Sequence, residues 1–275
     1  MGTTTQEIIK KLQIGIEELF ETEKYAEYLR FLSRFHSYSA SNCLLIAMQC
    51  PDATLIASYT DWQRQKRQVK RGARAITILA PHTYKKKDAD GNEHECLGFH
   101  AASVFDVSAT YSSDGKELSN IVHVLDGALS DQRLLDVLIE IAPVPVEFEN
   151  ITTGANGYFS PSECRIVIKT GLSEIQTAKT LLHETAHAWL HAKGAEEENA
   201  DQRTREVQAE SVAYTVCCYL GLDTSEYSFG YIAGWSKDRT LDELKSSIGV
   251  IARTADRIIT DLEDLQKGAT NADIA

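Results

Sequence analysis

The stretch LLHETAHAWLH, residues 181–191, constrains the fold more strongly than any other part of this 275-residue chain. Its apolar positions follow a helical period, a capping box precedes it and a glycine follows it, so we predict a helix over residues 174–193. Residues four apart lie on the same helix face, roughly 6 Å from each other. His183 and His187 can therefore hold one metal ion between them.

Glu184 follows the first of these histidines and points about 100° around the helix from it. From there its carboxylate can reach a metal-bound water without being a ligand itself. A zinc peptidase needs two neutral imidazoles for Zn²⁺ and one carboxylate that takes a proton from the activated water. We therefore predict His183 and His187 as zinc ligands and Glu184 as the general base.

A catalytic zinc site also needs a third protein ligand and an open position for water. His191 lies one more turn along the same helix, too far from His183 to share one tetrahedral ion, and we interpret it as a helix-end residue or a support for a ligand. A helix expected over residues 201–220 carries Glu206 and Glu210 one turn apart. We predict Glu206 as the third ligand and Glu210 as the acceptor of a ligating imidazole's free N–H. Alternatively, Glu210 is the ligand in place of Glu206, or both glutamates belong to an acidic helix face that is exposed to solvent.

The segment RIVIK, residues 165–169, comes directly before the predicted metal-binding helix. In zinc peptidases of this build, an edge strand beside the active-site helix pairs with an extended substrate, and this segment is placed for that role. Alternatively, it forms the core of the sheet under the helix. The sequence is equally compatible with both interpretations.

Charge is distributed unevenly along the chain. Residues 1–128 carry 15 Lys and Arg against 16 Asp and Glu, whereas the remainder carries 13 against 24. Nine basic residues and one acidic residue lie from position 61 to position 87. Binding of single-stranded nucleic acid requires a positive groove with aromatic platforms, although such a basic run alone is more commonly a solvated face. The candidate DNA-binding residues are Tyr59, Trp62, Arg64, Lys66, Arg67, Lys70, Arg71 and Arg74.

The order of predicted elements indicates an α+β protein with two domains. We expect a mixed α/β domain over residues 1–127, followed over residues 128–275 by a zincin-like domain with a small sheet and the active-site helix. Helices are predicted over residues 5–20, 23–36, 41–48, 61–68, 131–142, 174–193, 201–220 and 239–266. Strands are predicted over residues 54–58, 75–81, 103–107 and 144–150, around an Asp-Gly turn at 90–91, and in a hairpin over 157–170.

No apolar run approaches the roughly 18 residues that a membrane span needs, and the first residues lack the apolar block of a secretory signal. The six cysteines form no C-x-x-C pair, which favours reduced thiols over a disulfide framework. We therefore expect a cytoplasmic protein with no membrane partner.

The second half of the chain resembles a known group of peptidases. The motifs HETAHAWLH and EVQAESVAY are similar to those of gluzincin-type zinc peptidases, and most closely of the ImmA/IrrE-like group. This resemblance implies Glu206 as a zinc ligand. It also implies that Glu210 occupies the place of the acid that supports a zinc-binding histidine in thermolysin-like relatives.

The first half resembles the N-terminal domain of the ArdC antirestriction proteins, including the LtrC-like proteins of Gram-positive mobile elements. The matching segments are YSASNCLLIAMQCPDATLIASYTDWQRQKRQVKRGARAITILAP and VFDVSAT, and FGYIAGWSKD near the last helix is also similar. The resemblance implies single-stranded DNA binding by this domain. Lys66 departs from the family pattern, because a glycine is expected at its position.

These observations lead to one expected function and two alternatives. We expect a protein of a mobile or conjugative element that is related to antirestriction, binds single-stranded DNA without sequence preference, and hydrolyses a peptide or protein substrate by means of a zinc-activated water. The first alternative is a non-enzymatic antirestriction protein with a structural or vestigial zinc site. The second is a regulatory peptidase that cleaves a repressor.

Overall fold

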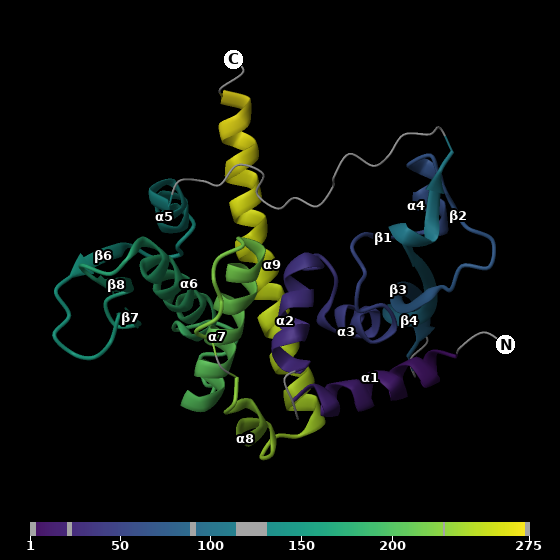
Figure 1. Cartoon of the computed structure of the whole chain (residues 1–275). Coiled ribbons are helices and arrows are strands. Elements are labelled where there is room, and N and C mark those ends of the chain that lie inside the picture. The colour runs from purple at the N-terminus through teal and green to yellow at the C-terminus, as the bar shows by residue number, and fades with distance from the viewer. Residues whose placement is uncertain (1–3, 21–23, 89–91, 114–130, 228, 273–275) are drawn as a thin grey trace. The chain divides into compact units, whose positions relative to one another are not determined.

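A computed structural model describes residues 4–20, 24–88, 92–113, 131–227 and 229–272 (Figure 1). It shows the predicted mixture of helices and small sheets. The chain forms two compact units, of which the first contains residues 1–19 and 41–123 and the second contains residues 20–40 and 124–275. Among the described residues, no helix has the length and apolar character needed to cross a bilayer.

The first unit combines short helices with two antiparallel sheets. The larger sheet has the order β1-β4-β3, and β2 pairs with β5. The elements are α1 (Thr5–Leu19), α3 (Ala40–Gln49), β1 (Ile56–Ser58), α4 (Tyr59–Arg64), β2 (Arg67–Val69), β3 (Ile76–Lys87), β4 (Glu93–Asp106), the 3-10 helix η1 (Val107–Ala109) and β5 (Thr110–Ser112).

Strands β3 and β4 form a long ribbon whose register pairs Ile76 with Val104 at one end and Lys87 with Glu93 at the other. The first pair is buried in the core of the unit, whereas the outer half of the ribbon is exposed to solvent. The edge of β3 is covered near its base, because Asn42 of α3 exchanges two hydrogen bonds with the backbone of β3. Such cover keeps a strand edge from pairing with another chain.

The segment after α4 differs from its prediction, because the expected helix over 61–68 ends at Arg64 and is followed by strand β2. Lys66 lies at the break with a φ of 56°. This is the left-handed conformation that glycine adopts most easily, so the turn is kept although lysine replaces the glycine expected there.

The second unit contains a three-stranded sheet and the longest helices. Strand β8 lies at the centre of the order β6-β8-β7, parallel to β6 and antiparallel to β7. The elements are α2 (Lys24–Arg34), α5 (Asp131–Glu140), β6 (Val146–Glu149), β7 (Gly157–Ser160), β8 (Arg165–Lys169), α6 (Glu174–His191), α7 (Gln202–Tyr219), α8 (Ile232–Ser236) and α9 (Leu241–Ala272).

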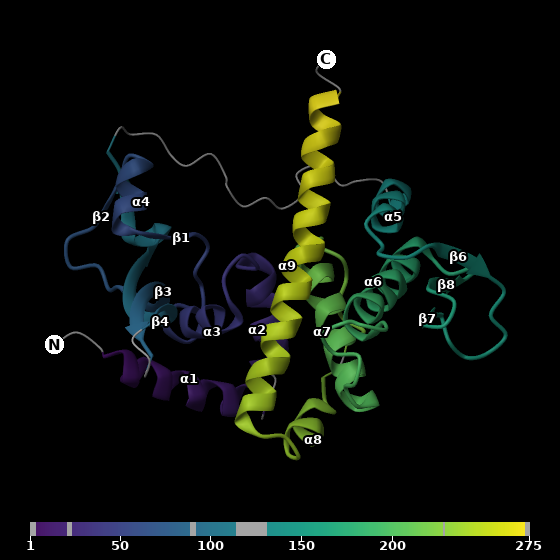
Figure 2. The ribbon, with the colours of Figure 1, turned by 180° about the vertical axis from the view of Figure 1, so that it is seen from behind.

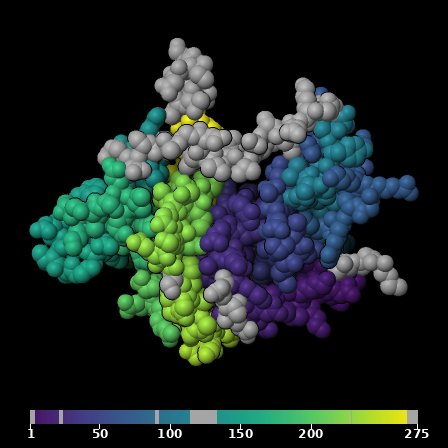
Figure 3. All heavy atoms as spheres, in the orientation of Figure 1, coloured from purple at the N-terminus to yellow at the C-terminus, as the bar shows by residue number. Residues whose placement is uncertain are grey.

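The layers of this unit follow one another from the sheet to α6, then to α7, and then to α2 and α9 (Figures 1 and 2). The same succession appears in the space-filling view as teal, green and purple atoms (Figure 3). Residues 20–40 are part of this unit because α2 packs on α7, where the Tyr25 hydroxyl lies 2.8 Å from the Ser211 hydroxyl. The domain boundary predicted near residue 127 falls outside the described residues.

RIVIK is not an edge strand, and the interpretation of this segment as the substrate-binding strand is wrong. It forms the central strand β8, in which Ile166, Val167 and Ile168 are all fully buried. A strand buried on both faces has a continuous apolar run for this reason. The edge beside α6 belongs instead to β7.

Candidate metal centre

Helices α6 and α7 bring three candidate ligand atoms together in the wall of a cleft of the second unit. His183 Nε2 lies 3.1 Å from His187 Nε2, and Glu206 Oε2 lies 3.6 and 3.8 Å from these two nitrogens. A triangle with these sides has a centre about 2.0 Å from each corner, which is the length of a zinc bond to imidazole or carboxylate. Two imidazoles and one carboxylate therefore fit a divalent cation.

Each helix is positioned by a local cap. Ser173 begins α6 and accepts a hydrogen bond from the Gln176 backbone N–H, and Asp201 begins α7 and accepts one from the Thr204 backbone N–H. The caps fix where each helix starts, and the helical period then fixes which side chains face the neighbouring helix. His183, His187 and Glu206 consequently face one another across the pair.

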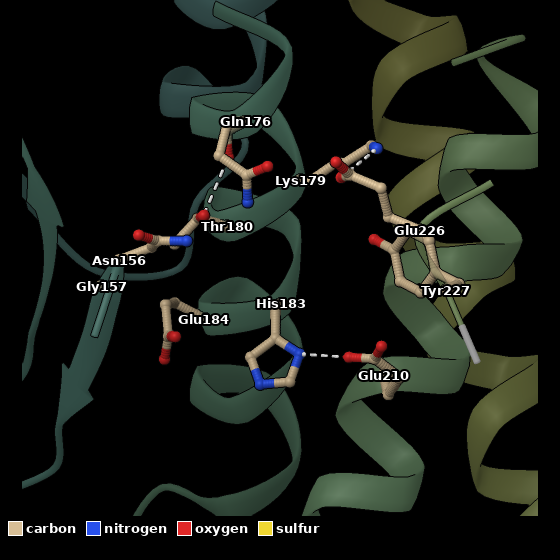
Figure 4. A pocket seen from close by; sticks show the side chains of 10 residues that line it. All are labelled: Asn156, Gly157, Gln176, Lys179, Thr180, His183, Glu184, Glu210, Glu226 and Tyr227. Atoms are coloured by element: carbon tan, nitrogen blue, oxygen red, sulfur yellow. Dashed lines mark hydrogen bonds and ion pairs between the residues drawn. The ribbon is translucent and has the colours of Figure 1, made fainter. Parts of the chain in front are cut away.

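Glu210 lies behind His183, where its carboxylate Oε2 is 3.3 Å from His183 Nδ1 (Figure 4). It can accept the Nδ1–H of His183 and leave Nε2 free to bind a metal. Burial disfavours charge on His183, but the nearby carboxylates of Glu206 and Glu210 outweigh it and raise the pKa of His183 to about 10 in the absence of a metal. The proximity of both histidines holds the pKa of Glu206 far below its usual range.

His187 is supported by a series of hydrogen bonds that begins at Glu197. The Glu197 carboxylate accepts a hydrogen bond from Gln208 Nε2 at 3.2 Å, so Gln208 Oε1 faces His191 Nε2 at 3.0 Å. His191 must then carry its proton on Nε2 and accept at Nδ1, which lies 2.9 Å from His187 Nδ1. The proton of His187 is therefore on Nδ1, and its Nε2 offers a lone pair to a metal.

His191 is thus a support for a ligand and lies outside the ligand triangle. It is 5% exposed, and burial lowers its pKa to about 4, which keeps its ring neutral at physiological pH, as the series of hydrogen bonds requires. Sequence reasoning left His191 open between this role and a helix-end residue, and it missed Gln208 and Glu197. The four-residue spacing of His187 and His191 was the available signal.

Glu184 lies on the side of His183 that faces β7 and is 8% exposed (Figure 4). Burial raises its pKa above the ordinary value, although the neighbouring His183 and His187 act in the opposite direction. A carboxylate in this environment takes up a proton more readily than an exposed one, which is the property expected of a general base.

Strand β7 forms the wall of the cleft opposite the two histidines. A cleft with a volume of about 640 Å³ is lined by Tyr158 and Phe159 of β7 and by His183, Glu184 and Glu206. Gly157 is required here, because a Cβ atom at this position would lie 2.7 Å from Thr180 Cγ2 of α6 and 2.9 Å from the Val167 carbonyl oxygen. The missing side chain allows β7 to approach α6 closely beside Glu184.

A second cavity of about 290 Å³ adjoins the first on the N-terminal side of His183 (Figure 4). Lys179 lies in its wall, one helical turn before His183, and forms an ion pair of 3.2 Å with Glu226. The Tyr227 ring lies 5.8 Å from the Lys179 ammonium group. The cavity therefore places charged side chains next to the candidate metal centre.

The candidate DNA-binding residues differ in how far they are exposed to solvent. Tyr59 is 50% exposed, but Trp62 is fully buried and donates its indole N–H to the Phe105 carbonyl at 2.8 Å. The Trp62 ring cannot serve as an exposed stacking platform, so the prediction of Trp62 as a DNA-binding residue is wrong. Its amphipathic indole is used inside the unit instead.

The basic candidates are mostly at the surface. Arg64, Lys66, Lys70, Arg71 and Arg74 are exposed. Arg64 forms an ion pair with Asp61, and the ammonium group of Lys70 donates to the Ser108 carbonyl. Arg67 is half-buried and donates from Nε to the Thr110 hydroxyl. Three of the basic side chains are therefore already engaged within the unit.

Comparison with known proteins gives two domain matches. Residues 2–110 match the family model described as the N-terminal domain of anti-restriction factor ArdC, and residues 139–219 match a peptidase-family model described as the IrrE N-terminal-like domain. An uncharacterized protein of Bacillus anthracis is 26% identical over 94% of this chain. This chain spans 51% of that relative, or about half its length.

Two solved structures share the fold. The metal-free crystal structure of the antirestriction ArdC protein from plasmid R388 has a TM-score of 0.57 and 20% identity, and the match covers 82% of this chain and 84% of that chain. The Mn(II)-bound structure of the same protein has a TM-score of 0.52 and 18% identity over the same shares.

Proposed function

Because the chain is an ArdC-like two-domain protein, we propose that its first unit binds single-stranded DNA and that its second unit hydrolyses peptide bonds at a zinc centre. We also propose that the protein acts in the cytoplasm, that its role is related to antirestriction, and that a mobile element encodes it. The observation that carries the enzymatic part is the convergence of two imidazoles and one carboxylate beside the buried Glu184.

His183, His187 and Glu206 would hold the zinc ion. When bound, zinc would polarise the peptide carbonyl and lower the pKa of a coordinated water. Glu184 would accept a proton from that water and deliver it to the leaving amine, because its carboxylate faces the cleft beside both histidines. The outer edge of β7, the last strand of the described sheet, would pair with the extended substrate and align the peptide bond along α6.

Zinc is proposed because the donor set is two histidine nitrogens and one glutamate oxygen, a set typical of zinc peptidases. The related R388 protein has a Mn(II)-bound structure, so the same test must compare both metals. Elemental analysis of the purified protein, followed by competition between Zn²⁺ and Mn²⁺, decides between them. Preferential retention of Mn²⁺ would contradict the zinc assignment.

The alternative of a structural or vestigial metal site leaves Glu184 with a structural role alone, its interaction with the Phe159 backbone of β7. The side chain is not needed to complete the ligand triangle, yet it is kept 8% exposed at the cleft with a raised pKa. Burial of a carboxylate is costly unless it is paired, and the groups that favour its charged form here are the two histidines and the Phe159 backbone of β7. This arrangement favours the hydrolytic function over the structural one.

The test of hydrolysis compares Glu184→Gln with Glu174→Gln, which alters an exposed glutamate in the first turn of the same helix. Both variants should retain stoichiometric zinc, and Glu184→Gln should cleave a peptide library about 10²–10⁴-fold more slowly than the unaltered protein. Glu174→Gln should cleave at the unaltered rate. Equal cleavage by both variants would refute the role of Glu184, and zinc loss from Glu184→Gln alone would favour the structural alternative.

The test of DNA binding is the salt dependence of affinity for a labelled single strand. Contacts to Z phosphates should give a slope near −0.7Z in a plot of log affinity against log salt. A flat response would refute the DNA-binding part of the proposal.

A further inference from the structure

The outer half of the β3–β4 ribbon has two chemically different faces. Side chains alternate between the faces of a strand, and directly paired residues share a face. The register pairs Ala80 with His100, His82 with Gly98, Tyr84 with Cys96, and Lys86 with His94. We call the face that carries His82, Tyr84, Lys86 and His100 the aromatic face.

The rings of the aromatic face form a continuous row. The His82 ring centroid lies 5.9 Å from that of Tyr84 and 5.4 Å from that of His100. A Cβ atom at Gly98 would lie 2.8 Å from His82 Cε1 and 3.1 Å from Tyr84 Cε1. The absence of a side chain at Gly98 therefore lets both rings lie across the neighbouring strand.

This row of rings is open to solvent. Tyr84 is 46% exposed, and His82 and His100 are also exposed. A tyrosine on an outer ribbon gains little by stacking on neighbours that remain wet, so its packing within the unit does not account for the row. The exposed ring faces are available to a partner.

The two faces also differ in how their charged side chains are paired. The opposite face also exposes apolar groups, Leu97 and Phe99, but it carries Glu93 and Glu95 beside them. Lys85 and Lys87 lie on that face as well and form ion pairs with Glu93. The aromatic face carries Lys86, and the described acidic side chain at its tip, Asp88, is paired with His94 of the same face at 2.8 Å.

We propose that the aromatic face is the platform on which the bases of single-stranded DNA stack. Rings that stack on unpaired bases, with a cation beside them for the phosphates, are how proteins bind single strands without reading sequence. On the opposite face the charges of Lys85 and Lys87 are balanced by Glu93 and Glu95, so that face offers phosphates no net attraction. The assignment rests on the proposed DNA-binding function and locates it on the ribbon, where sequence reasoning placed the aromatic platforms at Tyr59 and Trp62.

The test compares two single substitutions on opposite faces of the same ribbon in the full chain. Tyr84→Ala and Phe99→Ala each remove one exposed ring, of 46% and 52% exposure. Affinity for labelled oligodeoxythymidylate is measured by fluorescence anisotropy. Loss of the Tyr84 ring should weaken binding about tenfold, whereas loss of Phe99 should change it by less than about twofold.

Two further measurements separate stacking from loss of structure. Tyr84→Trp should retain the affinity, and its indole fluorescence should be quenched when the oligonucleotide binds. Lys86→Ala should reduce the salt slope by about 0.7, the value for one phosphate contact on a single strand. Circular dichroism confirms that each variant is folded.

The outcomes distinguish this assignment from the function on which it rests. Binding by the unaltered protein that is insensitive to Tyr84→Ala, or that is lost equally in Phe99→Ala, would overturn the assignment and leave DNA binding intact. An unaltered protein that does not bind the oligonucleotide would overturn the DNA-binding function and the assignment with it.

Discussion

The hydrogen bonds that run from Glu197 to His187 predict that Gln208→Leu weakens metal binding, although Gln208 touches no candidate ligand. Gln208 is 1% exposed, and leucine has a similar volume. The substitution removes the acceptor of the His191 Nε2–H, 3.0 Å away. A buried donor without a partner costs about 1–3 kcal/mol.

His191 can avoid this cost only by moving its proton to Nδ1. That nitrogen lies 2.9 Å from His187 Nδ1, so two N–H groups would then point at each other. His187 would have to move its own proton to Nε2, which is the atom that should bind the metal. The penalty therefore falls on the metal site, and loss of a supporting partner of this kind weakens metal binding about 10–100-fold, or roughly 1.4–2.7 kcal/mol.

The assay is zinc competition against a chromophoric chelator at constant pH, with the visible spectrum of the Co(II)-substituted protein as a second measurement. Glu197→Gln is the matched control, because a glutamine at 197 still offers an oxygen to Gln208 Nε2. It should bind zinc within about threefold of the unaltered protein. A Gln208→Leu protein that is folded and binds zinc as tightly as the unaltered protein would refute the assigned proton positions.

Three further outcomes follow from the geometry. His183 has a pKa raised to about 10 in the metal-free protein, so its charge stabilises the fold fully below about pH 6.5 and this contribution is lost as the pH rises through 10. Zinc needs the neutral ring, so zinc affinity should rise about tenfold per pH unit between about pH 7 and 9, and calorimetry in several buffers should detect proton release. Gly157→Ala should destabilise the protein by about 1–3 kcal/mol in urea unfolding and slow peptide cleavage, whereas Gly154→Ala, whose Cβ would meet nothing within 4 Å, should do neither. Lys66→Gly should raise the free energy of unfolding by up to about 1 kcal/mol, since lysine is strained at a φ of 56°, and a loss of stability would contradict the strain argument.

The helical period made the arrangement of the candidate ligands predictable from the sequence. Spacings of four place His183 with His187 and Glu206 with Glu210 on single helix faces, and the structure brings these faces together. Local signals of this kind depend only on residues within one helix. The α+β composition and most helices and strands were predictable for the same reason.

The remaining features depend on contacts between distant segments. His191 binds Gln208 across 17 residues, and Trp62 is buried because β4, more than 40 residues later, accepts its indole N–H. The apolar run of β8 is equally consistent with an edge or a central strand until the positions of its neighbours are known. No periodicity within a segment carries this information.

The membership of residues 20–40 in the second unit has a consequence for how the chain folds during synthesis. The polypeptide passes between the two units at residues 19/20, 40/41 and 123/124, so its two ends do not correspond to two separable halves. Tyr25 meets Ser211 only after another 186 residues have been made, which takes roughly 10–40 s at ordinary rates of translation. During that time α2 has no α7 on which to bury its apolar side chains. In a nascent chain, α2 must therefore remain without its packing partner until α7 has been synthesised. A fragment that starts near residue 128 would lack α2 altogether.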